Sequence, residues 1–419
     1  MFSPPSLTVL RCSKRSELIE EIDAQLPSRY ECRFMSPPKC IVDADGDDMV
    51  VFIPNRFDDQ VKPKRHPCDI GNYDEQVIIV DTSCGGAVLR GADIFAPGVV
   101  TCTETFVDDV AGVWCDISND PRNRFGKGKD TFILKGARFP INAEFKEKLV
   151  FIGYGRVVIP RKDLFCEQPV MNGISIQMTR PVFDCPPISN EFLKSCKNEA
   201  SLQNYGSIQI CKALLNAIKA SGMKEKDLSI FDMCSAPGGK TAFLINALPN
   251  CKWYAGDKPS RINLVSSTVT PISESLDVSL QLVPGDSTAT AFPDGFFNSI
   301  LLDAPCSATG SRPKPVFGNT SARQVKSYQK LQRKLLHEAI RLLKSGGILV
   351  YSTCSIMDDE NAKNVSYVLE KYKNIKLEDE VAFNPFKQDT VDINGIRHIP
   401  NQCDKFDTIG FFCAQFKKD

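Results

Sequence analysis

The second half of the chain alternates short apolar runs with longer amphipathic segments. Four of the runs are LSIFDM from Leu228, CKWYAGD, VSLQLVPGD and FFNSILLDAPC, and ILVYSTC and FFCAQFKK follow later. From Leu202, apolar residues recur every three or four positions, which predicts an amphipathic helix. Further helices are predicted over 323–344 and 358–372. Strands that alternate with helices require a parallel sheet, so 228–419 is predicted to be a doubly wound, Rossmann-like α/β domain.

The first half of the chain has a different pattern. Residues 1–76 are predicted to be an α+β region, with a helix around Ser13 to Leu26 and short strands between prolines. Residues 77–180 carry short β-type runs, VIIVD, FILKGARFP and EKLVFIGYGRVVIP, which predict a small inserted β-barrel. Residues 181–227 are predicted to be a linker and a helical lead-in to the α/β domain.

The stretch FDMCSAPGGKT, from Phe231 to Thr241, joins a predicted strand to a predicted helix through a glycine-rich turn. Glycines let the backbone approach a ligand closely, and amides at a helix start face polar or anionic groups. The stretch contains neither GxGxxG nor a P-loop, so a dinucleotide and a nucleoside triphosphate are both disfavoured. The candidate cofactor-binding residues of the turn are Cys234, Ser235, Ala236, Pro237, Gly238, Gly239 and Lys240.

Three acids follow the turn at the ends of the next predicted strands, Asp257, Asp286 and Asp303. A doubly wound fold places an acid about 20 residues beyond such a turn, on the ribose hydroxyls. One glycine turn followed by three acids suits a neutral or cationic adenosine ligand. S-adenosylmethionine is therefore the leading cofactor candidate.

Composition excludes several other classes of protein. With 419 residues, two or three domains are expected. The 17 cysteines contain no CxxC pair and the chain has three histidines, so neither a disulfide framework nor a metal site is expected. No run of 18 apolar residues and no convincing secretory signal is present. We therefore expect an intracellular, cytoplasmic protein without a membrane span.

Charge is balanced overall but uneven along the chain, with formal net charge zero. Between residues 312 and 344 the only acidic residue is Glu338, whereas the basic residues are Arg312, Lys314, Arg323, Lys326, Lys330, Arg333, Lys334, Arg341 and Lys344. Such a helix can meet a polyanion, or it can be a solvated helix face. A second basic group accompanies the predicted barrel, with Arg122, Arg124, Lys127, Lys129, Lys135 and Arg138.

Two cysteines are placed for chemistry. Cys306 follows Asp303 in DAPCSATG, and Cys354 ends the next strand in YSTCS. Both lie at the strand ends where doubly wound sheets bind ligands. An isolated cysteine is usually inert packing, but here an acid and an adenosine-type pocket are predicted beside both thiols.

Four ordered motifs, CSAPGGKT, DAPCSATGSRP, YSTCS and DTIGFFCAQFKK, resemble those of the Sun-domain family of RNA cytosine-5 methyltransferases. The resemblance runs from about Leu202 to the last residue. CGGAVLRGADIFAPGVV, from Cys84 to Val100, with the later GYG, resembles a PUA domain, an RNA-binding pseudo-barrel; a generic barrel is the alternative. A PUA domain ahead of the catalytic domain resembles the member-six subgroup, whose substrates are tRNA acceptor ends.

The resemblance implies a role for each motif residue. Cys354 matches the nucleophile that adds to carbon 6 of cytosine, and Cys306 matches the residue required for release of the product. Asp303 matches the acid that holds the cytosine ring edge. Lys240 lies near the same pocket and lowers a thiol pKa or holds the substrate, unless it is only a solvated helix start. Asp257 is expected to bind the ribose and Asp286 to lie near the adenine amino group.

The implied partner is RNA, with tRNA favoured, and the protein is expected to be a monomer. Because the target atoms of a paired cytosine are hidden, the base must be single-stranded or flipped out, which requires an RNA-binding module. The alternatives are an rRNA cytosine-5 methyltransferase and a non-catalytic RNA-binding protein. A pure binding protein has no need of two motif cysteines.

Overall fold

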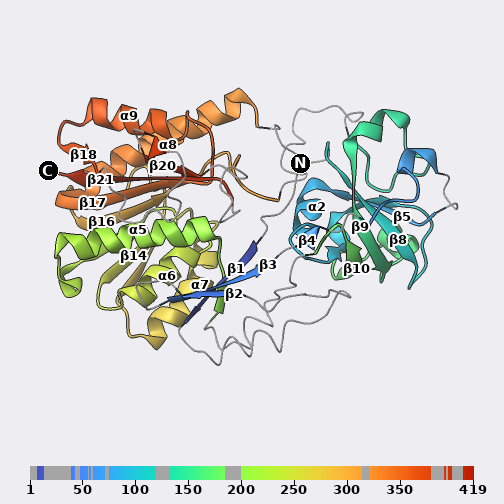
Figure 1. Ribbon diagram of the computed structural model, residues 1–419, viewed down its shortest axis with the longest axis horizontal. Helices are drawn as coiled ribbons and strands as arrows, with labels where there is room; N and C mark the ends of the chain where they lie inside the picture. Colours follow the sequence, from blue (N-terminus) through green and yellow to red (C-terminus); the bar gives the residue numbers. More distant parts are fainter. Residues whose placement is uncertain are drawn as a thin grey trace. The chain divides into compact units, whose positions relative to one another are not determined.

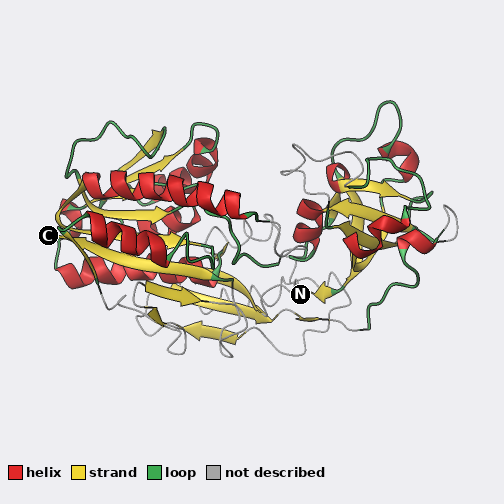
Figure 2. Cartoon of the chain, turned by 90° about the horizontal axis from the view of Figure 1, so that it is seen from above, coloured by secondary structure: helices red, strands yellow, loops and turns green. Residues whose placement is uncertain are grey.

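The computed structural model describes residues 60–70, 75–118, 132–183, 201–313, 320–378 and 409–419, together with Arg11 and the backbone of short strands within 7–57, 184–200 and 391–398. The described residues form two compact units that divide between Leu202 and Gln203. Figure 1 shows both units along the chain, and Figure 2 shows strands in both units and the longer helices in the second. The division lies inside the segment predicted to be a linker and helical lead-in.

Unit 2 is built on a mixed sheet whose strands follow the order β15-β14-β13-β16-β17-β21-β20-β19, with β18 also paired to β21. Its strands are β13 (Ser229–Asp232), β14 (Lys252–Asp257), β15 (Leu280–Pro284), β16 (Phe297–Asp303), β17 (Leu343–Thr353), β18 (Ile375–Leu377), β19 (Val391–Asp392), β20 (Gly395–His398) and β21 (Phe411–Lys418). Strands β13 to β17 pair in parallel, and β21 is antiparallel to β17. The order reverses at β13, so its carboxyl end is the switch point at which such sheets bind ligands.

Helices cover both faces of this sheet. They are α5 (Tyr205–Ser221), α6 (Gly239–Ala247), α7 (Ile262–Ser275), α8 (Ala322–Leu342) and α9 (Ala362–Lys371), with a short turn η6 (Glu225–Asp227). In Figure 1, α8 and α9 lie on one side of β17 and β21, and α5 and α6 lie on the other. On the α8 side, Leu336 and Val365 pack with Phe231 and Phe297 of the strands in one buried cluster. The predicted doubly wound α/β domain is confirmed.

Two predicted helix starts are wrong. The helix predicted from Leu202 begins at Tyr205, because Leu202 pairs with Leu10 in a strand, β12 (Ala200–Leu202). The helix predicted from Asp358 begins at Ala362. Its expected first residues form a turn, since the Glu360 and Asn361 side chains point into a buried network instead of capping a helix.

The larger sheet of unit 1 has six strands in the order β6-β10-β9-β8-β5-β7. Its elements are β5 (Val77–Asp81), α2 (Thr82–Val88), β6 (Ile94–Phe95), β7 (Val99–Cys102), β8 (Val110–Asp116), β9 (Leu149–Val157), α3 (Arg161–Leu164) and β10 (Ile174–Pro181), with short turns η1 (Pro67–Asp69), η2 (Ala96–Gly98) and η5 (Ala143–Lys148). Alternate residues of β5 enter two different buried clusters, so both faces of the sheet are covered. The assignment of this sheet to a PUA domain, with its bounds, stays a prediction.

A smaller sheet of unit 1 is antiparallel. Its order is β12-β1-β3-β2, with β1 (Leu7–Ser13), β2 (Lys39–Val42) and β3 (Asp48–Pro54), and a separate pair joins β4 (Arg56–Phe57) to β11 (Phe183–Asp184). Ser13 is therefore the last residue of a strand and does not start a helix. The rest of the helix predicted to Leu26 lies outside the described residues.

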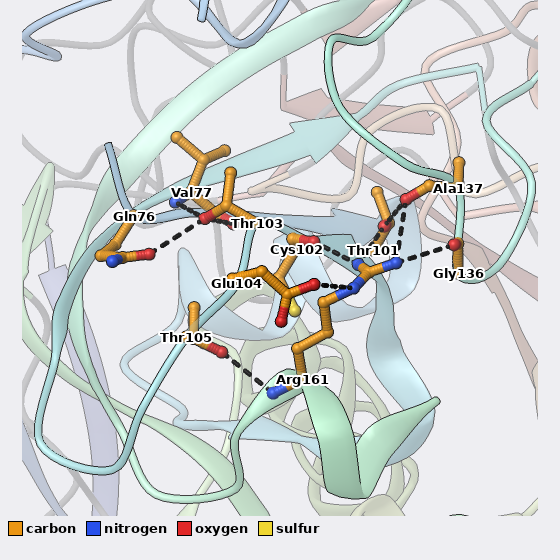
Figure 3. A network of polar contacts seen from close by, with 10 residues as sticks. All are labelled: Gln76, Val77, Thr101, Cys102, Thr103, Glu104, Thr105, Gly136, Ala137 and Arg161. Atoms are coloured by element: carbon orange, nitrogen blue, oxygen red, sulfur yellow. Dashed lines mark hydrogen bonds and ion pairs between the residues drawn. The ribbon is translucent and has the colours of Figure 1, made fainter. Parts of the chain in front are cut away.

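The prediction that the run FILKGARFP forms a strand is wrong. Residues 132–140 form bends and turns, and Gly136 has a φ of +77°. Arg161 holds this loop, because its guanidinium donates to the carbonyls of Gly136 at 3.0 Å and of Cys102 (Figure 3). The buried guanidinium donates the hydrogen bonds that a neighbouring strand would otherwise supply to these carbonyls.

Within the described residues, no helix combines the length and the apolar character that crossing a bilayer requires.

Candidate active site

The turn between β13 and α6 has the conformation that its glycines allow. Gly238 has a φ of +108°, and a Cβ added to it would lie 2.9 Å from the Cβ of Thr268. Glycine is therefore required there. Beside Gly239 an added Cβ would meet no atom within 4 Å, so the backbone at the start of α6 faces open space. The turn predicted from the sequence is confirmed.

Asp257, at the end of β14, fixes this turn. Its carboxylate accepts hydrogen bonds from the amides of Ala236 at 2.9 Å and Lys258 at 2.8 Å. Arg261, which sequence reasoning missed, donates to the carbonyl of Ala236 at 2.9 Å. A carboxylate oxygen has two lone pairs, so Asp257 retains acceptor capacity toward ribose hydroxyls.

The two residues between Met233 and Ala236 hold the turn but differ in kind. Ser235 donates to the carbonyl of Gly256 through its amide at 2.9 Å and through its hydroxyl at 3.0 Å. An alanine at this position would lack the second bond, because it has no hydroxyl. Burial raises the pKa of Cys234 well above its usual value. Cys234 is thus an inert part of the turn.

Asp286 lies at the same edge of the sheet, beyond β15. It is exposed, and bonds from the amide and hydroxyl of Thr288 lower its pKa. Ser287 donates to the carbonyl of Met233 at 2.6 Å and so ties this loop to the cofactor turn. Asp257, predicted to bind the ribose, and Asp286, predicted to lie near the adenine, therefore both lie beside one turn. Their carboxylates can accept hydrogen bonds from the hydroxyl and amino groups of an adenosine ligand.

Asp232 was missed by sequence reasoning, although it is the last residue of β13. It is buried, it accepts a bond from the Thr241 hydroxyl at 2.7 Å, and burial raises its pKa to about 7. An acid that ends the strand ahead of a glycine turn was the available signal.

Lys240 and Asp303 form an ion pair between α6 and the end of β16. The Lys240 Nζ lies 2.6 Å from Asp303 Oδ2, and Ser352 donates to Asp303 Oδ1 at 2.8 Å. Burial by itself would lower the Lys240 pKa, but the Asp303 carboxylate raises it above its usual value. Lys240 is therefore bound to Asp303 instead of being solvated at a helix start.

Cys306 and Cys354 lie together, with their Sγ atoms 3.3 Å apart. The hydrogen bond from Cys306 lowers the pKa of Cys354 against the effect of burial, and the charge of Lys240 also lowers it. The same bond and burial raise the pKa of Cys306 well above its usual value. The pair is thus polarised, because the two shifts make Cys354 the more acidic thiol and favour Cys306 as the donor.

The loop that follows Cys306 packs backbone against backbone. The Gly310 amide donates to the carbonyl of Cys354 at 3.0 Å, and the Gly410 amide donates to the carbonyl of Gly310 at 2.8 Å. A Cβ on Gly310 would lie 2.4 Å from the Gly410 oxygen. Ala308 has a φ of +52°, a conformation that glycine adopts at no steric cost.

A buried polar network under the two cysteine loops was also missed. Its members are Gln332 of α8, Tyr351, Ser355, Glu360, Asn361 and Asn364. Glu360 lies in the first turn of the helix predicted over 358–372, where a solvated charge would be expected, but it is fully buried. A glutamine on the apolar face of α8 and the polar run DDENAKN were the available signals.

The basic residues predicted on one helix divide into two groups. Arg341 pairs with Asp294 at 2.6 Å and with Glu338 at 2.7 Å, and Lys344 donates to Asn298 at 3.0 Å. Those toward the start of α8 are exposed, namely Arg323, Lys326, Lys330 and Lys334. Only this first half offers charge to a polyanion, and Lys314 lies outside the described residues.

Metal ligands do not gather in the described part of the chain, where no three His, Cys, Asp or Glu side chains are placed to share an ion.

Comparison with known proteins shows the family of the chain. Residues 220–417 match the family described as 16S rRNA methyltransferase RsmB/F. The tRNA (cytosine(72)-C(5))-methyltransferase NSUN6 of Mus musculus is 31% identical over 90% of this chain and 73% of its own length. The tRNA (cytosine(72)-C(5))-methyltransferase of Pyrococcus horikoshii is 28% identical over 82% of this chain and 75% of its own.

Among solved structures, that of NSun6 from Pyrococcus horikoshii with SFG superposes with a TM-score of 0.71 and 23% identity. The superposition covers 100% of this chain and 92% of that one, and it supports the fold. Together with the sequence matches over most of both chains, it confirms the resemblance drawn from the four motifs. The chain belongs to the Sun-domain (RsmB/F) family of RNA cytosine-5 methyltransferases.

Proposed function

We propose that this protein methylates carbon 5 of a cytosine in tRNA, near the 3′ acceptor end, with S-adenosylmethionine as the methyl donor. The observation that carries the proposal is the polarised cysteine pair, 3.3 Å between Sγ atoms, at the sheet edge that also holds the glycine turn. The tRNA target is supported by the names of the relatives from mouse and Pyrococcus horikoshii.

Cys354 begins the reaction. Its thiolate forms a bond to carbon 6 of the cytosine, and the electrons of the 5,6 double bond move into the ring toward N3. N3 takes up a proton from water as this charge reaches it, and Asp303, at the end of β16, accepts a hydrogen bond from the protonated ring edge. Lys240 keeps Asp303 in place through the 2.6 Å ion pair. Positioned acid–base groups of this kind contribute about 10²- to 10⁴-fold in rate.

When bound, S-adenosylmethionine supplies an electrophilic methyl group at its sulfonium. Carbon 5, made nucleophilic by the thiolate, would form the new carbon–carbon bond as the methyl–sulfur bond breaks, and the rest of the cofactor would leave as a neutral thioether. We assign the cofactor contacts to the turn from Cys234 to Lys240, with Asp257 toward the ribose and Asp286 toward the adenine. The hydrogen bond that Asp257 accepts from the amide of Ala236 orients the turn for that contact.

Cys306 acts in release. The hydrogen bond to Cys354 is the largest cause of its raised pKa, and this bond is lost once the Cys354 sulfur is bonded to carbon 6. Without that bond Cys306 loses its own proton to water more readily, and its thiolate then takes the proton from carbon 5, directly or through water. Loss of that proton re-forms the 5,6 double bond and expels the Cys354 thiolate.

Binding of the RNA requires contacts outside the reaction site. In unit 1, a hollow of about 650 Å³ carries Lys135, Arg138 and Lys162 on its walls. In unit 2, the start of α8 exposes four basic side chains. Contacts of this kind bind phosphates and set the register of the RNA without reading its sequence. The basic residues predicted at 122, 124, 127 and 129 lie outside the described residues.

The proposal also includes a monomeric, cytoplasmic enzyme. Light scattering after gel filtration, and fluorescence microscopy of the tagged protein, test these two points. A mass of twice 46.4 kDa would exclude the monomer.

The test is transfer of labelled methyl groups into separated tRNA and rRNA pools, followed by bisulfite mapping. Label at a cytosine near a tRNA 3′ end is expected. Label in rRNA alone would keep the chemistry but overturn the target, and no label in any RNA would leave an RNA-binding protein. In parallel, Cys306→Ala is expected to trap a covalent RNA–protein adduct on denaturing gels, and its absence would remove Cys306 from the release step.

A further inference from the structure

Glu360 lies under both cysteine loops and is fully buried. Its Oε1 accepts bonds from the amide of Ser307 at 2.9 Å and from Gln332 Nε2 at 3.0 Å. Its Oε2 accepts bonds from the hydroxyl of Ser355 at 2.6 Å and from the hydroxyl of Ser307. Four donors therefore converge on one carboxyl group.

The donors identify what the carboxyl group holds. Ser307 directly follows Cys306, and Ser355 directly follows Cys354, so one side chain connects the two loops. The loops are 48 residues apart in the sequence. Other polar bridges between the loops run through the hydroxyls of Ser307, Thr309 and Ser355 and the amides of Gly310 and Ile356. Glu360 adds a carboxyl group that binds the amide and hydroxyl of Ser307 in one loop and the hydroxyl of Ser355 in the other.

A second layer orients this carboxyl group. Gln332 Nε2 also donates to the carbonyl of Pro305 at 3.0 Å, immediately before Cys306. Asn364 donates to Gln332 Oε1 at 2.9 Å and to the carbonyl of Glu360 at 3.2 Å. These bonds fix both the backbone and the carboxyl group of Glu360 in one position. A residue that supports reacting groups is expected to be held in this way.

We propose that Glu360 is a positioning residue for product release, because it sets the distance at which Cys306 faces Cys354. This inference rests on the proposed function, in which Cys306 acts after Cys354 has bonded to carbon 6. A misplaced Cys306 slows release more than it slows attack by Cys354. A displacement of about 1 Å costs such a step about 10²-fold.

The test compares Glu360→Gln with the unchanged enzyme in one assay of methyl transfer and adduct formation. The glutamine has the same size, but its amide nitrogen cannot accept a hydrogen bond and would face groups that also donate. One of the two loops would therefore lose its contact with this side chain. We expect kcat to fall about 100-fold, with little change in KM for either substrate. We also expect the RNA adduct to accumulate, as a milder form of the Cys306→Ala result.

Glu338→Gln is the matched control. Glu338 is another buried glutamate of unit 2, and it accepts bonds from the amide of Thr290 at 2.8 Å and its hydroxyl at 2.7 Å, away from the cysteine loops. We expect this variant to lose stability without a change in the ratio of adduct to turnover. A purely structural role of Glu360 would give the same result for Glu360→Gln, and that result would overturn the inference.

The outcomes separate this inference from the proposed function. If the unchanged enzyme labels no RNA, the proposed function fails, and if Cys306→Ala traps no adduct, the release role of Cys306 fails. If Cys306→Ala traps an adduct and Glu360→Gln keeps the normal ratio, only the positioning role fails. Should Glu360→Gln not fold, Ser355→Ala removes a single donor. It is expected to raise the adduct fraction in the same direction, and an unchanged fraction would overturn the inference.

Discussion

The carboxyl edge of the sheet in unit 2 has two halves that are built differently. The cofactor half, at the ends of β13, β14 and β15, is held largely by backbone groups, as where the amides of Ala236 and Lys258 bind Asp257. The reaction half, at the ends of β16 and β17, is held by side chains that bind one another, as in the pairs of Cys306 with Cys354 and of Lys240 with Asp303.

The difference predicts how each half tolerates change. A backbone amide survives substitution of its own side chain, so the cofactor half keeps most of its shape in a variant. In the reaction half the atoms that pair Cys306 with Cys354 and Lys240 with Asp303 belong to replaceable side chains. Loss of one partner leaves the other unsatisfied, which costs about 1–3 kcal/mol. Variants of the two halves should therefore separate into mild and severe classes.

Cys354→Ala gives the largest expected effect. Without the thiolate, no covalent bond to carbon 6 forms, and turnover falls by at least about 10⁴-fold. The cofactor half is untouched, so calorimetry should give an unchanged affinity for S-adenosylmethionine. Undiminished turnover in this variant would exclude Cys354 as the nucleophile.

Lys240→Gln sharpens the comparison, since Lys240 starts α6 in the cofactor half but reaches Asp303 in the reaction half. We expect single-turnover methyl transfer to fall about 100-fold. Lys219→Gln, on the exposed end of α5, is the control and should not differ from the unchanged enzyme. If Lys240→Gln alters only cofactor affinity, Lys240 belongs functionally to the other half.

The pH profile of adduct formation tests the same residue. The bond from Cys306 lowers the pKa of Cys354 to about 7 against the effect of burial, and the charge of Lys240 also lowers it. The thiolate is the reactive form, so the rate should rise with pH through about 7 and then level off. In Lys240→Gln the Cys354 pKa is higher, and the rise should move to higher pH. Superimposable profiles would show that the lysine charge does not reach the thiol.

Asp257→Asn gives a smaller expected effect. Asparagine retains one acceptor but places an amide nitrogen against the amide of Ala236 or Lys258. Hydrogen bonds to charged groups contribute about 1.5–3 kcal/mol, so cofactor affinity should fall at least about tenfold. Isothermal titration calorimetry measures this, with Asp227→Asn, which is exposed ahead of β13, as the control. Equal affinities for the two variants would remove Asp257 from the cofactor site.

Ser235→Ala should change least. The hydroxyl bond to the Gly256 carbonyl is lost, but the amide of Ser235 still donates to that oxygen at 2.9 Å. We expect a loss of about 1 kcal/mol in the free energy of unfolding, measured with urea, and an unchanged kcat. A large loss of activity would contradict the tolerance proposed for the cofactor half.

The same contrast explains what could be predicted from the sequence. The strand, the glycine turn and the helix of the cofactor half are contiguous, so periodicity and glycine placement were sufficient to locate them. The motif cysteines were located by strand ends and by resemblance to a family. The position of Glu360 was not predicted, because its partner Ser307 lies 53 residues away and no periodicity reports such a pairing. Likewise, the loop at 132–140 looked like a strand because the burial of Arg161 beneath it has no local signal.

The contact between Gly310 and Gly410 has a consequence for how the enzyme matures. A ribosome releases the chain from its N-terminus, so the carbonyl of Gly310 lacks its Gly410 partner until residue 410 has emerged, about 100 residues later. β21, which follows Gly410, then fills its place between β17 and β20. We expect the cysteine pair to gain its polarised form only at that stage of synthesis, so that a nascent chain carries no reactive nucleophile.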